Sequence, residues 1–92
     1  MTLKETLRMM YSENLYNEML FDLYAKKDNI PAAEWRRATD MGRTYRKTAR
    51  QLGRALQKHF KDGWDVMAQA TRETQERFNR DMAQFLEPAK TD

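Results

Sequence analysis

Residues 38–61 read ATDMGRTYRKTARQLGRALQKHFK, and this stretch contains two contrasting faces of one helix. Because successive helical residues are about 100° apart, its apolar side chains recur on a single side, which predicts a stripe that faces a core. The stripe consists of Ala38, Met41, Tyr45, Ala49, Leu52, Leu56 and Phe60. A long amphipathic helix here, with no strand-like alternation elsewhere in the chain, predicts an all-α fold.

The opposite side of this helix is basic. Its Lys and Arg residues recur at intervals of three, four or seven, so they form one row over about seven helical turns. We call these residues the basic row: Arg36, Arg43, Lys47, Arg50, Arg54, Lys58 and Lys61. Asp40 is the only acid on the same arc, although the whole chain has a net charge of only +3. The row therefore either neutralises acids elsewhere in the protein or marks a binding face.

Small residues form a third feature of this helix. Ala38, Gly42, Ala49 and Gly53 lie within about 60° of one another on the apolar side. Two glycines inside a helix cost about 2 kcal/mol relative to alanine, so their presence indicates close packing. We expect this groove to receive another helix, either from the same chain or from a second copy.

Working outward from this helix, we predict a small three-helix bundle in a single domain, residues 1–92, with helices at 3–27, 31–61 and 65–86 and a frayed tail at 88–92. Gly and Pro are scarce and good helix formers are abundant. The third helix is expected to turn its large apolar residues toward the core. These residues are Trp64, Met67, Phe78, Met82 and Phe85.

Local signals set the expected helix ends. Thr2 and Glu5 fit a capping box, and Pro31 suits the first turn of a helix. Gly63 is predicted to end the second helix in the left-handed conformation. However, the apolar stripe of the second helix continues in phase through the third, and one glycine costs a helix only about 1 kcal/mol. One long bent helix across Gly63 is therefore the alternative.

The first helix is apolar around most of its circumference, apart from a polar strip of Asn14, Glu18 and Asp22. Such a helix is either sandwiched between two others or contacts a further surface. Under the second interpretation, it contributes an apolar interface to a partner or to a homodimer. The residues proposed for that interface are Tyr16, Leu20, Phe21 and Tyr24.

The sequence contains little that could support catalysis. There is no Cys and only one His, His59, so a transition-metal site lacks its usual ligands. Single glycines at 42, 53 and 63 form no phosphate-binding loop. The acids and bases of the third helix suggest solvated i,i+4 pairs, Glu73–Arg77 and Glu76–Arg80. We therefore predict a non-enzyme with no metal and no cofactor.

The same composition suggests where the protein acts. No apolar run is long enough to cross a membrane, and the polar residues near the N-terminus argue against a signal peptide. With no cysteine for an oxidising compartment, a cytoplasmic location is the expectation.

Three interpretations of the basic row compete. It could be a solvated face, but such faces usually interleave acids. It could bind nucleic acid through phosphates, without sequence specificity, because the row has no base-reading or stacking side chains. It could dock on an acidic protein or ribonucleoprotein surface, where arginine makes bidentate contacts with carboxylates, with Trp35 as an apolar anchor.

We favour the third interpretation and keep nucleic-acid binding as the alternative. Small helical proteins that lack cysteine and catalytic residues often act by occlusion. The inhibitors and adaptors of phages and plasmids, including anti-CRISPR proteins, have this general profile. The similarity is one of size and class, with no shared motif.

Overall fold

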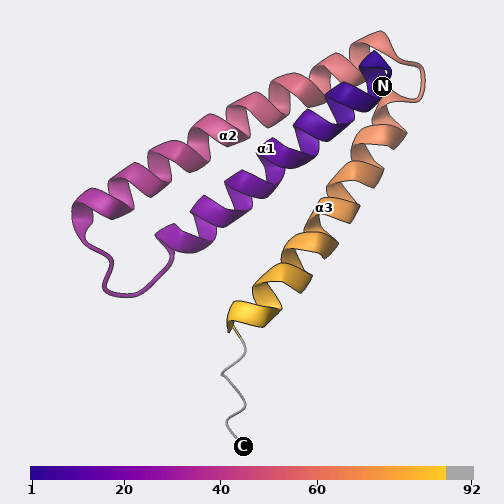
Figure 1. The fold of residues 1–92 in the computed structure, drawn as a ribbon. Helices are drawn as coiled ribbons and strands as arrows, with labels where there is room; N and C mark the ends of the chain where they lie inside the picture. The colour runs from indigo at the N-terminus through magenta and orange to yellow at the C-terminus, as the bar shows by residue number, and fades with distance from the viewer. Residues whose placement is uncertain (87–92) are drawn as a thin grey trace, which may run out of the picture.

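The structure, a computed structural model, describes residues 1–86 and contains three helices. They are α1 (Leu3–Ala25), α2 (Ala32–His59) and α3 (Gly63–Leu86). Figure 1 shows α1 and α2 side by side as an antiparallel hairpin, while α3 leaves the far end of α2 and diverges from it along the other side of α1. The predicted all-α three-helix fold is confirmed, and α1 is the central helix. The expected frayed tail lies outside the described residues.

The start of α1 follows the predicted capping box. The backbone N–H of Glu5 donates to the Thr2 hydroxyl at 3.1 Å, and the Glu5 carboxylate accepts from the Thr2 backbone. The helix ends at Ala25, two residues before the predicted end, and Lys26 caps it through its backbone N–H. Asn29 then adopts a φ of 62°, a left-handed conformation that asparagine tolerates better than most residues. This turn reverses the chain into α2.

The junction between α2 and α3 contains the predicted break, but Gly63 has a different role there from the one predicted. Phe60 is extended, with φ −132° and ψ 136°, so α2 and α3 are separate helices. Gly63 is not left-handed, because no glycine among residues 1–86 has a positive φ. It begins α3 instead, and a β-carbon there would lie 2.0 Å from the carbonyl oxygen of Leu56. Glycine is needed because the first turn of α3 packs directly on the last turns of α2.

The groove of small residues on α2 is occupied by helices of the same chain. Ala38, Gly42, Ala49 and Gly53 are all buried. A β-carbon on Gly42 would lie 2.8 Å from a carboxylate oxygen of Asp22 in α1. A β-carbon on Gly53 would lie 3.3 Å from the Tyr11 ring in α1 and 3.0 Å from the sulfur of Met67 in α3. The predicted close packing is confirmed and is intramolecular.

The core is centred on four buried residues, with partly buried side chains around them. The four are Tyr11, Ala49, Leu56 and Ala70, and their neighbours are Leu7, Leu15, Leu52, Phe60, Val66 and Met67. Three hydroxyl groups are accommodated there by hydrogen bonds. The Thr74 hydroxyl donates to the carbonyl oxygen of Ala70 at 2.6 Å, and the hydroxyls of Tyr11 and Thr71 share a hydrogen bond of 2.7 Å.

The buried seam of α3 is shifted from the predicted one. Its most buried positions are Gly63, Ala70, Thr74 and Phe78, of which Phe78 packs on the Tyr16 ring at a centroid distance of 5.7 Å. Trp64 is 66% exposed and Phe85 is 77% exposed, so the prediction that both face the core is wrong. Small residues let the start of α3 approach its neighbours closely, and divergence of α3 leaves its far end uncovered.

The predicted ion pairs within α3 are also wrong. Glu73 pairs with Arg8 of α1 instead of Arg77, and Arg77 pairs with Asp81 at 3.8 Å. The Arg77 guanidinium also lies over the Tyr16 ring, 4.3 Å from its centroid. Among the described residues, Glu76 and Arg80 form no pair with each other. The charges of α3 thus help attach it to α1.

Candidate protein-binding surface

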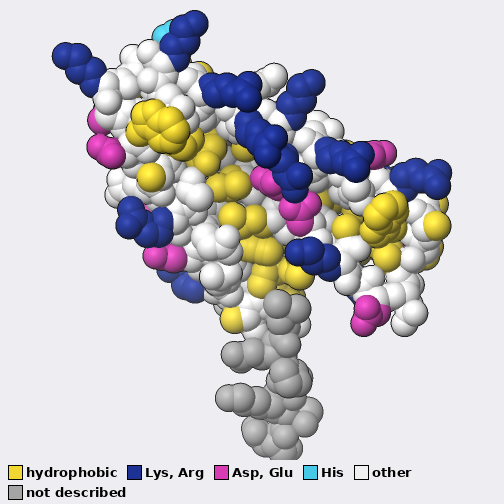
Figure 2. Space-filling view, turned by 180° about the vertical axis from the view of Figure 1, so that it is seen from behind, with side chains coloured by type: hydrophobic (Ala, Val, Ile, Leu, Met, Phe, Trp, Pro, Cys, Tyr) yellow, Lys and Arg dark blue, Asp and Glu magenta, His cyan; other side chains and the backbone are white. Residues whose placement is uncertain are grey.

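The structure places the basic row on the exposed side of α2. All seven of its residues are exposed, and none forms an ion pair with a residue in 1–86. Lys61 lies beyond the end of α2, so the helical part of the row ends at Lys58. Figure 2 shows Lys and Arg side chains gathered along the upper edge of one face, above a band of apolar side chains.

Two acids of α1 are matched by a different cation, Arg46, which is not in the basic row. Its Nε donates to Glu18 at 2.6 Å and one of its terminal nitrogens donates to Asp22 at 3.3 Å. The Glu18 side chain is 14% exposed. The hydrogen bond to Glu18 and its negative charge raise the pKa of Arg46 above its ordinary value. Intramolecular charge matching therefore involves Arg46 and leaves the basic row without partners among the described residues.

A shallow depression follows the exposed side of α2. Only α2 side chains line it, and none is a carboxylate. They are Arg43, Arg46, Lys47, Arg50, Gln51 and Arg54. Like charges held together without acids create a positive potential that favours carboxylate or phosphate groups. The depression is thus suited to an anionic surface.

Beside the depression lies an apolar groove of about 380 Å³, where the three helices meet. Tyr11 and Leu15 of α1, Ala49 and Gly53 of α2, and Met67 of α3 provide its apolar surface. Its polar margin consists of Glu18, Arg46, Arg50, Arg54 and Gln57. Arg50 and Arg54 thus border both the groove and the depression, so exposed cations lie directly beside apolar surface.

Sequence reasoning did not find this groove. Its residues come from three helices, and their proximity depends on how α3 meets the hairpin. The available signal was the position of Gly53 and Gln57 on the α2 wheel, between the buried stripe and the basic row. That position indicates that small residues lie next to the basic row. It does not indicate that Met67 of α3 lies opposite them.

The proposed apolar interface of α1 is largely used inside the protein. Tyr16 packs on Phe78 and donates its hydroxyl to Asp81, and Phe21 stacks on Tyr45 with a centroid distance of 5.7 Å. The four residues are therefore not one free surface, because α2 and α3 each cover part of α1. Leu20 and Tyr24 line a surface hollow, although the Tyr24 hydroxyl donates to Glu34 at 2.8 Å.

The other predicted anchor, Trp35, is 48% exposed near the start of α2. It does not line the apolar groove, whose α2 residues begin at Arg46. The predicted site residues are therefore distributed along α2, with Trp35 and Arg36 at one end and Lys58 at the other. Trp35 remains available as a second, separate apolar contact.

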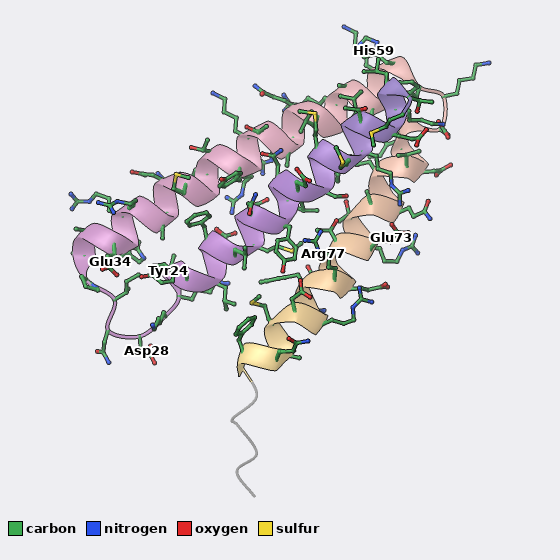
Figure 3. The ribbon with its side chains drawn as sticks, in the orientation of Figure 1. Tyr24, Asp28, Glu34, His59, Glu73 and Arg77 are labelled. Atoms are coloured by element: carbon green, nitrogen blue, oxygen red, sulfur yellow. The ribbon has the colours of Figure 1, made fainter. Side chains whose placement is uncertain are left out.

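The single histidine, His59, lies far from the acidic side chains at the turn between α1 and α2 (Figure 3). Figure 3 shows His59 at one end of α2, whereas Glu34, Tyr24 and Asp28 lie at the opposite end of the hairpin. His59 is exposed. Among residues 1–86, no group of three or more His, Asp or Glu side chains is arranged to hold a metal ion. None of the three described helices combines the length and apolar character of a bilayer-spanning segment.

Comparison with known proteins provides no assignment. No family model, no curated protein and no solved structure matches the chain. The α2 surface and its surroundings are therefore the basis for any proposed function.

Proposed function

We propose that the protein is a non-enzymatic helical binding protein that docks on an acidic protein or ribonucleoprotein surface. The contact uses the basic row of α2 together with the neighbouring apolar side chains. One observation supports this proposal above all: exposed arginines without an ion-pair partner in residues 1–86 border an apolar groove. Interfaces commonly combine apolar cores with charged rims in this manner.

The main alternative is non-specific binding of nucleic acid. The depression lined by five cations and no carboxylate favours it, because phosphates bind such surfaces and release counterions. A phosphate backbone, however, makes no use of the apolar groove. Aromatic side chains, on which successive bases stack, are also absent from the depression. These two points favour a protein partner.

The proposal includes a mode of action. By analogy of size and class with phage and plasmid inhibitors and adaptors, including anti-CRISPR proteins, the protein occludes the surface on which it docks. A rigid helix bearing a row of cations covers an elongated acidic strip, because its side chains repeat along about 30 Å or more of helix. The partner is therefore expected to present carboxylates along a comparable length.

Charge reversal tests the proposal. The variant Arg43→Glu, Lys47→Glu, Arg50→Glu and Arg54→Glu should lose capture of its partner from host-cell lysate while retaining its helical circular dichroism. A matched variant reverses Lys26, Arg37, Arg72 and Arg80, which are also exposed and form no ion pair with a residue in 1–86. Both variants undergo the same change in net charge, so only the position of the change differs.

Nuclease treatment and salt dependence separate the two functions. A protein partner should be captured equally with and without nuclease. Affinity for a random DNA duplex should be negligible at physiological salt. Duplex binding that weakens steeply with salt, together with loss of capture after nuclease treatment, would instead establish nucleic-acid binding. If the variant with the four α2 cations reversed still captures its partner, the basic row is only a solvated face.

A further inference from the structure

We infer that the apolar groove between α1, α2 and α3 receives an acidic amphipathic helix of the partner. An apolar side chain of that helix enters the groove, and its carboxylates contact Arg50 and Arg54. This inference rests on the proposed function and specifies both the partner's chemistry and the part of the surface that recognises it.

The floor of the groove is formed by small residues. Ala49 is 3% exposed and Gly53 is buried, so the α2 backbone lies low between the neighbouring side chains. Leu15 and Met67 are only partly buried beside it. A methionine side chain adapts readily to an incoming apolar group. Because the Met67 sulfur already lies close to Gly53, an apolar side chain that enters the groove has to displace the Met67 side chain.

The polar side chains around the base of the apolar groove already form hydrogen bonds within the protein. The Tyr11 hydroxyl is hydrogen-bonded to Thr71, and the side-chain amide of Gln57 donates to the Met67 sulfur at 3.0 Å. Tyr11 is only 8% exposed, so it offers no platform on which a nucleobase could stack. These contacts favour an apolar side chain as the occupant.

The margin of the groove determines the charge of the partner. Arg46, Arg50 and Arg54 follow one another at intervals of four residues, a rise of about 6 Å each. Arg46 is held by Glu18 and Asp22, whereas Arg50 and Arg54 form no ion pair within residues 1–86. Carboxylates at i and i+4 of a second helix have the same spacing. An acidic helix alongside α2 can therefore contact both free arginines.

Helix-in-groove recognition of this type depends on apolar anchors as well as charge. A suitable probe is a synthetic helical peptide with a row of leucines flanked by glutamates at i and i+4 intervals. Its control has every leucine replaced by alanine and retains all glutamates. Fluorescence anisotropy measures both affinities, and the Met67 methyl resonance, assigned with Met67→Leu, reports occupancy of the groove.

We expect the leucine peptide to bind at least about tenfold more tightly than the alanine peptide, since burial of leucine side chains removes apolar surface from water. Only the leucine peptide should shift the Met67 methyl resonance. Leu15→Ala should weaken binding of the leucine peptide, whereas the matched Leu23→Ala, at a partly buried leucine of α1 that does not line the groove, should not. If Leu15→Ala unfolds the protein, the shift of the Met67 methyl resonance in the wild-type protein shows whether the peptide occupies the groove.

The outcomes distinguish the two proposals. Equal binding of both peptides with an unmoved Met67 resonance overturns the groove inference and leaves docking on an acidic surface intact. Binding of neither peptide at low salt contradicts both. A shift of the Met67 resonance caused by a random DNA duplex, rather than by the leucine peptide, also overturns the inference.

Discussion

The Nε of Arg46 donates to Oε1 of Glu18 at 2.6 Å, and this contact lies where the acids of α1 meet the basic side of α2. The next arginine along the same edge, Arg50, is exposed and forms no ion pair within residues 1–86. Two arginines one turn apart therefore have different roles. Arg46 joins α1 to α2, whereas Arg50 is exposed on the surface of α2.

Substitution of these two arginines should separate stability from binding. Arg46→Gln leaves Glu18, which is 14% exposed, without its charged donor, and should lower the free energy of unfolding by about 1–2 kcal/mol. Arg50→Gln should change it by less than about 0.5 kcal/mol but should weaken binding to the acidic leucine peptide. Urea denaturation and anisotropy measure the two effects. Equal destabilisation by both substitutions would contradict the assignment.

Gly63→Ala should be strongly destabilising because the added β-carbon would lie 2.0 Å from the backbone oxygen of Leu56. Backbone cannot swing aside as a side chain can, so we expect a loss of about 3 kcal/mol or more. Gly42→Ala is the matched control, because its added carbon meets the Asp22 carboxylate, the end of a flexible side chain. Thermal unfolding should show a much smaller change for Gly42→Ala. A mild effect of Gly63→Ala would contradict the close junction of α2 and α3.

Tyr16 should make stability depend on alkaline pH. Its hydroxyl donates to Asp81, and this hydrogen bond, together with burial, raises the pKa of Tyr16 above its ordinary value of 10.0. The contribution to stability is therefore present below about pH 10 and is lost as the pH rises through the higher folded-state pKa. Tyr16→Phe should cost about 1 kcal/mol at neutral pH, and the difference from wild type should shrink at alkaline pH. Urea denaturation of both proteins from neutral to alkaline pH measures this difference in stability.

Truncation of Phe78 to alanine should lower the free energy of unfolding much more than truncation of Trp64. Phe78 is 7% exposed against Tyr16, so Phe78→Ala should cost about 3 kcal/mol or more. Trp64 is 66% exposed, and Trp64→Ala should cost less than about 1 kcal/mol. Phe78→Leu provides a milder change if the alanine variant does not fold. A large loss for Trp64→Ala would show that this side chain is covered.

The sequence predicts the hairpin well because its signals are local or periodic. The Thr2–Glu5 capping box and the small residues Gly42 and Gly53 depend on spacing within one helix, and the structure confirms both. The exposure of the basic row follows from the same periodicity. Its partner-binding role stays a prediction.

The errors concern α3, whose position depends on contacts between helices. The phase of its apolar residues suggested Trp64 as a core residue, but close packing of Gly63 on Leu56 rotates the buried seam to smaller residues. Likewise, Glu73 has a basic neighbour in its own helix and another on α1, and only the tertiary arrangement selects Arg8. Periodicity within a helix contains no information on either choice.

Because α3 diverges from the hairpin, we expect the free energy of local unfolding to differ between the two halves of α3. Its first half contacts both helices of the hairpin near Met67. Its second half diverges from α2 (Figure 1) and contacts Tyr16 of α1 through Phe78 and Asp81. Backbone amides of the second half should therefore exchange with solvent by opening that leaves the hairpin folded. Amides around Gly53 should exchange only when the whole domain unfolds, so the groove persists while the far end of α3 fluctuates.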